Sequence, residues 1–178
     1  MTFPHRGCTV FALGLLLAAP LALADEVVIT WPAGWSVEEL PAGSDPAVHR
    51  QRAAKNDANG DPQMVVELTR TALAPDHQVN LGGVVLEMRK ALQINFSHGG
   101  YQSVCTKVHD SKLGDIAAVE TTCKISLNGG HVMTQTLVAG SAPGAAYSLS
   151  YAGSAQGYAD NEAQVQAIRD GLKLQQTQ

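Results

Sequence analysis

Several features that would point to a particular function are scarce in this sequence. The 178-residue chain has 12 Lys and Arg against 16 Asp and Glu, and charged residues make up only 16% of it. A nucleic-acid binder needs an excess of Lys and Arg gathered on one face, so the composition excludes that class. Hydrophobic residues make up 45% and the formal net charge is only -4, which excludes a disordered polymer. The chain therefore contains a globular domain.

Long apolar runs are also scarce, and the one that stands out lies at the start. Val10 to Leu23 follows a short beginning that carries Arg6 and no acid, and it ends in the small residues of Ala22-Leu23-Ala24. A basic start, an apolar stretch and an A-x-A end are the three parts of a secretory signal peptide. The run is shorter than the roughly 20 residues of a membrane span, which disfavours the alternative of a retained anchor helix.

The predicted cleavage site fixes the expected domain organisation. A lipoprotein would have a cysteine directly after the small residues, but Asp25 stands there. We expect a signal peptide over residues 1–24 and a single domain over 25–178, in the periplasm or secreted, with no membrane span after cleavage. No internal repeat, charge block or long linker divides this region, and about 150 residues are enough for one hydrophobic core.

The hydrophobic pattern predicts strands first, then a helix, then a run of strands and a last helix. Asn59-Gly60 between two extended runs indicates a hairpin, and Asp76 or Asn80 is a candidate cap for the central helix. Segregated strands and helices predict an α+β fold, an antiparallel sheet covered by two helices. The expected strands are 26–30, 48–55, 64–73, 101–109, 116–127, 131–139 and 146–151, and the expected helices are 78–96 and 158–172.

Two segments resemble a known fold. One is Trp31-Pro32-x-Gly34-Trp35 near the start. The other is Tyr147-Ser148-Leu149-Ser150-Tyr151, followed by a short loop, Tyr158 and an amphipathic helix that ends in Leu172-Lys173-Leu174. Together with the central helix they resemble the PsbP-like α/β/α sandwich. The chain from residue 25 also resembles a family of small secreted proteobacterial proteins of unknown function. The resemblance implies a fold and a compartment, and it carries no catalytic residues.

Cys105 and Cys123 are the cysteines of the predicted mature domain. An even count in an oxidising compartment favours a disulfide, and a hairpin centred on Gly114 would place the two thiols opposite each other. Such a bond would stabilise the fold by about 3 kcal/mol. The rival hypothesis is a metal site with His109 and His131, since Cys105 and His109 share strand parity. These residues lack the paired spacing of zinc ligands, so we predict a disulfide, no metal and no cofactor.

Motifs for hydrolysis are absent. The chain has no G-x-S-x-G elbow, and His109-Asp110-Ser111 are contiguous, which favours a polar turn over a catalytic relay. Glu67, Glu87 and Glu120 are isolated acids, without the pairing that a glycosidase requires. The segment that begins at Asp57 opens like an EF-hand calcium loop, but Pro62 and Leu68 stand where that loop needs Gly and Glu. The sequence therefore predicts no catalytic residues.

Two groups of side chains are candidates for binding. Trp31 and Trp35 bracket a turn and are possible contacts for a ligand or partner, although for at least one of them we favour a place in the core. A basic cluster could contact an anionic partner, but a solvated strand face offset by Glu67 is the favoured interpretation. That cluster consists of His49, Arg50, Arg52 and Lys55.

These observations favour a non-enzymatic binding or accessory module of the cell envelope, whose partner is an unknown envelope protein or a small ligand. The alternative is a hydrolytic enzyme whose site is assembled from His and Ser residues far apart in the chain. No nucleic-acid partner is expected, and the oligomeric state stays open.

Overall fold

A computed structural model describes residues 27, 29–41, 43–74 and 76–174. The predicted signal peptide lies outside the described residues. The elements in chain order are β1 (Trp35–Leu40), β2 (Val48–Asn56), β3 (Pro62–Ala72), α1 (Leu81–Ser97), β4 (Gln102–Cys105), β5 (His109–Leu113), β6 (Ile116–Leu127), β7 (Gly130–Ala142), β8 (Ala145–Ser154) and α2 (Ala155–Asp170). None of the helices in this part of the chain is long and apolar enough to cross a membrane.

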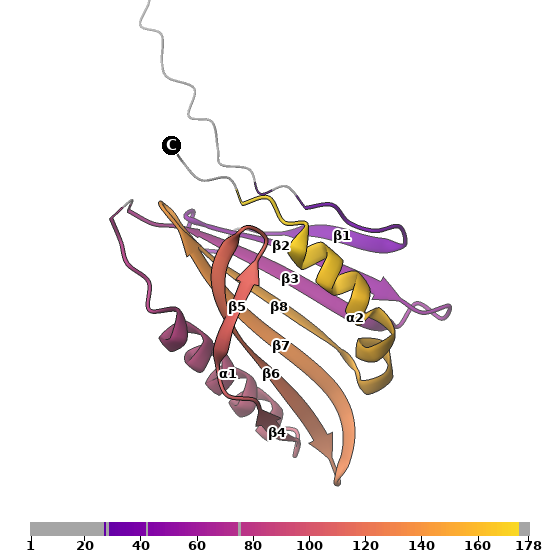
Figure 1. Ribbon diagram of the computed structural model, residues 1–178. Helices are drawn as coiled ribbons and strands as arrows, with labels where there is room; N and C mark the ends of the chain where they lie inside the picture. Colours follow the sequence, from indigo (N-terminus) through magenta and orange to yellow (C-terminus); the bar gives the residue numbers. More distant parts are fainter. Residues whose placement is uncertain (1–26, 28, 42, 75, 175–178) are drawn as a thin grey trace, which may run out of the picture.

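The strands form one antiparallel sheet in the order β1-β2-β3-β8-β7-β6-β4, and β5 also pairs with β6. The two helices lie on opposite sides of this sheet (Figure 1). Helix α1 packs on β4, β6 and β7, whereas α2 packs on β3, β7 and β8 and contacts β5. This arrangement confirms the predicted α+β fold, an antiparallel sheet covered by two helices.

Each side of the sheet has its own hydrophobic core. Helix α2 contributes Tyr158, Val165 and Ile168 to the larger one, where they meet the alternate residues of β3 and β8. Period-2 alternation along those strands directs one set of side chains to α2 and the other set to the opposite side. The smaller core contains Leu92 of α1 with Cys123, Ile125 and Leu137. We call these two regions the α2 core and the α1 core.

Local signals account for the helix starts and the first hairpin. Asn80 caps α1, where its side-chain oxygen accepts a hydrogen bond from the Gly83 N–H at 3.0 Å. Ser154 caps α2 in the same way, with the Gly157 N–H as donor at 2.9 Å. Each cap satisfies an N–H that has no partner within the helix. The predicted hairpin at Asn59-Gly60 joins β2 to β3, as expected.

Two of the expected strands are wrong. The described residues of 26–30 form no strand, and the first strand is Trp35–Leu40 instead. Val27 and Ile29 pack against the α2 core, which explains their apolar character without a sheet partner. The second error is the strand expected over 101–109, which is divided between β4 and β5.

The division of that strand has a physical reason. Cys105 pairs with Cys123 and His109 pairs with Glu120, so three residues of one strand stand opposite two of the other. This extra residue interrupts the ladder like a bulge. The turn is also shorter than the expected 110–115, because Leu113 already pairs with Ile116. Gly114 occupies the turn with φ +57°, and a side chain there would collide with the Leu172 carbonyl of the chain after α2.

Candidate functional site

The tryptophan pair closes one end of the α2 core. Trp35 is only 9% exposed, and its indole N–H donates to the Gln164 side chain of α2 at 3.0 Å. Trp31 is half-buried, lies 6.2 Å from the Trp35 ring and donates to Gln51 at 3.2 Å. Trp35 therefore has the core role that was favoured for at least one of the pair. Contact of either ring with a ligand or partner stays a prediction.

A buried ion pair joins α2 to the β5–β6 hairpin. The Arg169 side chain is 8% exposed and that of Glu120 is 16% exposed, with 2.7 Å between their charged atoms. Arg169 also donates to the Lys112 carbonyl at 2.7 Å and to the Ser111 hydroxyl. Because Arg169 has donors in a planar fork, it can hold three acceptors of the hairpin at once. The sequence pattern does not predict this cluster, and its one signal is that Arg169 stands four residues after buried Val165, beside the apolar stripe.

The same cluster contains His109 and Ser111, for which the sequence favours a polar turn over a catalytic relay; they lie on strand β5, so the expected turn is wrong at these residues. Ser111 donates its hydroxyl hydrogen to Glu120 at 2.6 Å, and the Nε2 of His109 lies 3.2 Å from the other oxygen of Glu120. A nucleophilic serine needs a base that accepts its proton, with the acid on the far side of that base. Here the carboxylate stands between serine and histidine, and Arg169 neutralises it. The contacts bind the hairpin to α2 and do not activate the serine.

Cys105 and Cys123 form a disulfide between directly opposed positions of β4 and β6. Cys123 is fully buried in the α1 core, whereas Glu120, the partner of His109, meets α2 on the other side of the sheet. The expectation that Cys105 and His109 share a face is therefore wrong, because the extra residue between β4 and β5 reverses the alternation. In the described part of the chain, no three His, Cys, Asp or Glu side chains are close enough to hold a metal ion.

The loop that begins at Asp57 uses its carboxylate for the turn itself. Asp57 Oδ1 accepts hydrogen bonds from the N–H groups of Asn59 at 2.8 Å and Asp61 at 2.9 Å. Such bonds between a side chain and the backbone two residues on are typical of Asx turns. These contacts are those of a polar hairpin loop.

One large part of the sheet has neither of the two described helices on it. Helix α1 covers β4, β6 and β7, so the α1 side of β1, β2, β3 and β8 is left without a helix. The register aligns the side chains there in cross-strand rows, one of which runs Glu38, Arg52, Glu67 and Ser150. We call this surface the open sheet face. Its members are Glu38, Leu40, Arg50, Arg52, Ala54, Val65, Glu67, Thr69, Thr71, Ala146, Ser148, Ser150 and Ala152.

Ion pairs balance the charges of the open sheet face. Arg50 contacts Glu67 at 2.5 Å, and Arg52 lies 3.6 Å from Glu38. The arginines of the basic cluster therefore lie on a solvated strand face offset by Glu67, as favoured from the sequence. Lys55 turns away and donates to the Ala33 carbonyl at 3.5 Å. His49 also belongs to the opposite side, because it alternates with Arg50 along β2.

The sheet with a helix on each side defines the class of protein, an α/β/α sandwich of the PsbP type. The fold is similar to that of cyanobacterial PsbP (CyanoP) from Synechocystis sp. PCC 6803, with a TM-score of 0.62 at 10% identity over 85% of this chain and 88% of that one. LpqN of Mycobacterium tuberculosis, a protein involved in cell envelope biogenesis, gives a TM-score of 0.42 at 15% identity, over 83% of this chain and 82% of that one.

Residues 26–174 match the family described as Domain of unknown function (DUF4946), and the chain belongs to that family. No curated protein matches the sequence. The PsbP-like fold expected from the tryptophan turn and the closing helix is confirmed. At 10% identity the likeness to CyanoP concerns the fold alone, so no residue role is carried over from it.

Proposed function

We propose that this protein is an exported, non-enzymatic binding module of the cell envelope that contacts a partner protein through the open sheet face. The observation that carries the proposal is that face itself, a broad area of four strands that neither α1 nor α2, the helices of the described residues, covers. The side chains with catalytic potential are engaged elsewhere, since Ser111 and His109 are both directed to Glu120.

The chemistry of the open sheet face favours a protein over other partners. Its two arginines are matched by two glutamates, so it lacks the positive excess that nucleic acid or an anionic membrane would require. The hydroxyl and small side chains of β3 and β8 give a surface of mixed polarity. Transient protein interfaces have this composition, because they resemble the rest of a protein surface in polar content.

Two observations support export. The apolar run Val10–Leu23 with its A-x-A end has the pattern of a cleaved signal peptide. The disulfide between Cys105 and Cys123 would persist in an oxidising compartment and would be reduced in a bacterial cytosol. Both features agree with the periplasm or the medium.

Site-specific cross-linking tests the interaction. A photoreactive amino acid would replace Thr69 or Ser148 on the open sheet face. As the matched control, the same amino acid would replace Glu162, which is exposed on α2. We expect both face positions to cross-link the same single protein in the intact envelope, and Glu162 to give no such product. Equal products at all three positions, or none at the face, would contradict the proposal.

The hydrolytic alternative has its own test. Ser111→Ala removes the only hydroxyl of the cluster that contacts Glu120 among the described residues. If the purified protein hydrolyses p-nitrophenyl acetate and the variant loses that activity while keeping its fold, the module is an enzyme. We expect the wild type and the variant to show the same background rate.

A further inference from the structure

Trp31 is a half-buried aromatic side chain that several contacts hold in one orientation. Its indole N–H donates to the Gln51 oxygen at 3.2 Å, and the Gln51 amide donates in turn to one oxygen of Glu39. Trp35 lies on the core side of the Trp31 ring, 6.2 Å away, and is itself bonded to Gln164 of α2. A ligand that packs on Trp31 would therefore not have to order the ring first, which lowers the cost of binding.

The register of β1 and β2 places further exposed groups beside this ring. Gln51 stands opposite Glu39, and Ala53 stands opposite Val37. Ala53 belongs to the α2 core, so the alternation of the strands puts Val37, Glu39 and Gln51 on the α2 side as well. Val37 is 45% exposed. We call Trp31, Val37, Glu39 and Gln51 the Trp31 site.

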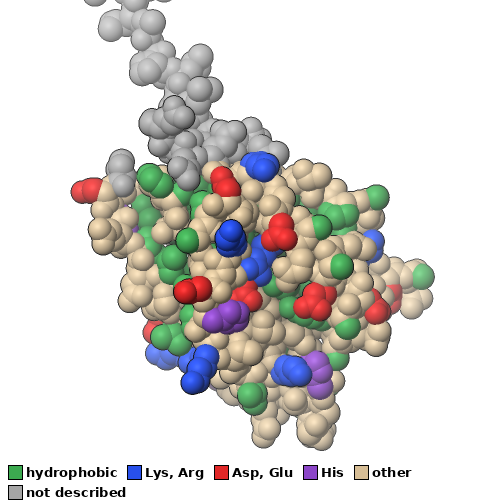
Figure 2. All heavy atoms as spheres, in the orientation of Figure 1, with side chains coloured by type: hydrophobic (Ala, Val, Ile, Leu, Met, Phe, Trp, Pro, Cys, Tyr) green, Lys and Arg blue, Asp and Glu red, His purple; other side chains and the backbone are tan. Residues whose placement is uncertain are grey.

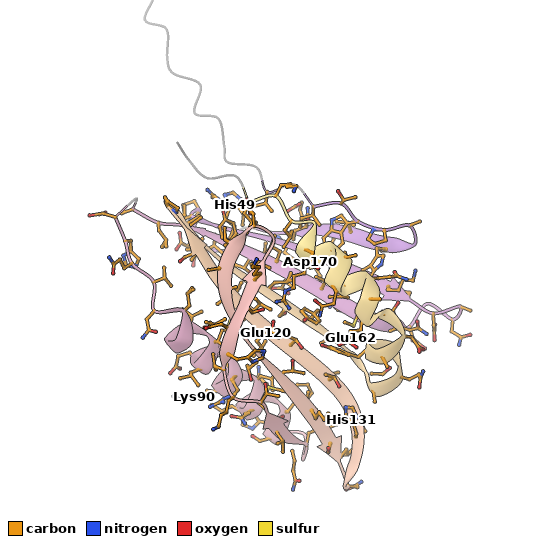
Figure 3. The ribbon with its side chains drawn as sticks, viewed as in Figure 1. His49, Lys90, Glu120, His131, Glu162 and Asp170 are labelled. Atoms are coloured by element: carbon orange, nitrogen blue, oxygen red, sulfur yellow. A yellow bond between two sulfur atoms is a disulfide. The ribbon has the colours of Figure 1, made fainter. Side chains whose placement is uncertain are left out.

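The surface around the Trp31 site contains apolar side chains and acids. Figure 2 shows apolar side chains at the surface over β1 and the adjoining part of α2, among uncharged polar atoms. Figure 3 labels Glu162 and Asp170 of α2, which are exposed on the same side of the sheet. A ligand here would pack on a mainly uncharged surface that has carboxylates at its margin.

Glu39 is the charged member of the Trp31 site. It makes no ion pair with a described residue, and one of its oxygens accepts no hydrogen bond from that part of the chain. The basic side chains of β2 on this side, His49 and Lys55, stand two and four residues from Gln51, and the Lys55 ammonium group donates to the Ala33 carbonyl at 3.5 Å. The second oxygen of Glu39 thus remains as an acceptor, and an anionic ligand would meet a like charge.

An aromatic ring beside a donor and an acceptor matches the chemistry of a sugar ring. A pyranose has a flat face of C–H groups, which suits the negative face of an aromatic ring, and its neighbouring hydroxyl groups can each donate and accept. In the Trp31 site, the second amide hydrogen of Gln51 can donate and the second oxygen of Glu39 can accept. The bond to Glu39 would be the stronger one, because its acceptor is ionised.

We propose that the Trp31 site binds a neutral pyranose ring of a saccharide, which stacks on Trp31 and forms hydrogen bonds with Gln51 and Glu39. Val37 adds an apolar contact beside the ring. The Trp31 site lies on the opposite side of the sheet from the open sheet face, so it stands or falls independently of the proposed partner surface.

An NMR titration of the folded, disulfide-bonded protein tests the site. The chain has two tryptophans, so an isotope-labelled sample gives two indole N–H signals, which the Trp31→Phe variant assigns. Cellotriose, chitotriose and maltotriose are the neutral probes, mannitol is a polyol without a ring, and trigalacturonate is a charged trisaccharide. We expect a saturable shift of the Trp31 signal with at least one neutral probe, a smaller shift of the Trp35 signal, none with mannitol and weaker binding of trigalacturonate.

Matched variants, followed by the backbone amides of residues 39 and 51, separate the roles of the side chains. Trp31→Ala should weaken binding about tenfold, and Trp31→Phe should retain part of it because an aromatic ring remains. Glu39→Gln still accepts from Gln51 but lacks the charge, so it should bind trigalacturonate as well as the neutral probe. Glu38→Gln makes the same change on the opposite side of β1 and should leave binding unchanged.

Three outcomes would overturn the proposal. They are the absence of a saturable shift with all three neutral probes, an equal response to mannitol, and unchanged binding in folded Trp31→Ala. Circular dichroism shows whether each variant is folded. If Trp31→Ala does not fold, the contrast between Glu39→Gln and Glu38→Gln decides, and equal behaviour of these two variants would also contradict the site.

Discussion

The two sides of the sheet are built differently. Among the described residues, the α2 core contains eighteen buried side chains from both ends of the chain, whereas the α1 core contains four. The α2 core is adjoined by the buried ion pair of Arg169 and Glu120, and the α1 core includes the disulfide. The disulfide between Cys105 and Cys123 therefore lies in the core that buries fewer apolar side chains.

The position of each helix explains the difference. Helix α2 lies over β3, β8 and β7, the middle of the sheet, and can bury side chains from strands on both of its flanks. Helix α1 lies over β7, β6 and the four-residue edge strand β4, so fewer side chains surround it. Because the helices are offset, the α1 side of β1, β2, β3 and β8 has no described helix on it, and the open sheet face lies there.

The largest effect is expected from the ion pair. Arg169→Met leaves the mostly buried carboxylate of Glu120 without its partner, which should lower the free energy of unfolding by about 3–5 kcal/mol. Arg52→Met, which removes an exposed pair, should cost about 1 kcal/mol or less. Urea unfolding followed by circular dichroism measures both. Equal small losses would show that the buried pair does not hold α2 to the hairpin.

A pair of cavity variants compares the two cores directly. Leu149 is 1% exposed in the α2 core and Leu92 is 6% exposed in the α1 core. Both Leu→Ala changes should destabilise the fold by about 2–5 kcal/mol, with Leu149→Ala the larger because its surroundings are more completely packed. The same urea experiment provides the values. A larger loss for Leu92→Ala would reverse the ranking of the cores.

Removal of the disulfide should have a somewhat smaller effect. The bond joins residues 18 apart, and the double change Cys105→Ala with Cys123→Ala should lower stability by about 3 kcal/mol. Unfolding midpoints with and without reductant measure it. The wild type should lose stability on reduction and the double variant should not respond. An unchanged wild-type midpoint after verified reduction would show that the α1 core needs no cross-link.

The smallest effect is a pH dependence that belongs to the α2 core. Burial raises the pKa of Tyr158 above its ordinary value near 10. As the pH rises above about 10, the unfolded chain loses this proton first, so stability falls by up to about 1.4 kcal/mol per pH unit. Tyr158→Phe should remove this part of the slope between pH 10 and 11, and Tyr101→Phe in the α1 core should keep it. Identical slopes for the two variants would contradict the assignment.

Much of the fold followed from local pattern. Asn59-Gly60 predicted the first hairpin, Asn80 was one of two candidate caps, and the stripe of Tyr158, Val165 and Ile168 predicted the buried side of α2. These signals depend on contacts within a few residues, where spacing alone determines which side chains meet. The prediction of one strand over 101–109 was wrong because it depends on a contact with a distant segment. Its break depends on a register with β6 that shifts by one residue, which the strand itself does not encode.

For the candidate sites, too, residue type could be read from the sequence, whereas contacts between distant segments could not. Trp31 and Trp35 could be singled out by type, but only packing against α2 and Gln164 decided that Trp35 belongs to the core. Arg169 gave almost no signal, since a lone arginine in a helix is usually solvated. Its burial became visible only when β5 and β6 placed Ser111 and Glu120 against it.

The amino-acid sequence was enough to predict a globular domain, the pattern of an export signal, the class of fold and the cysteines available for a disulfide. Tertiary structure decided which sides of the sheet are covered. It also decided that Glu120 is shared by Arg169 of α2 and by Ser111 and His109 of β5. The two kinds of feature differ in how far apart in the chain the interacting residues lie. Propensity and alternation act between neighbours in the chain, whereas the partners of a buried polar group come from segments that meet only in the folded state.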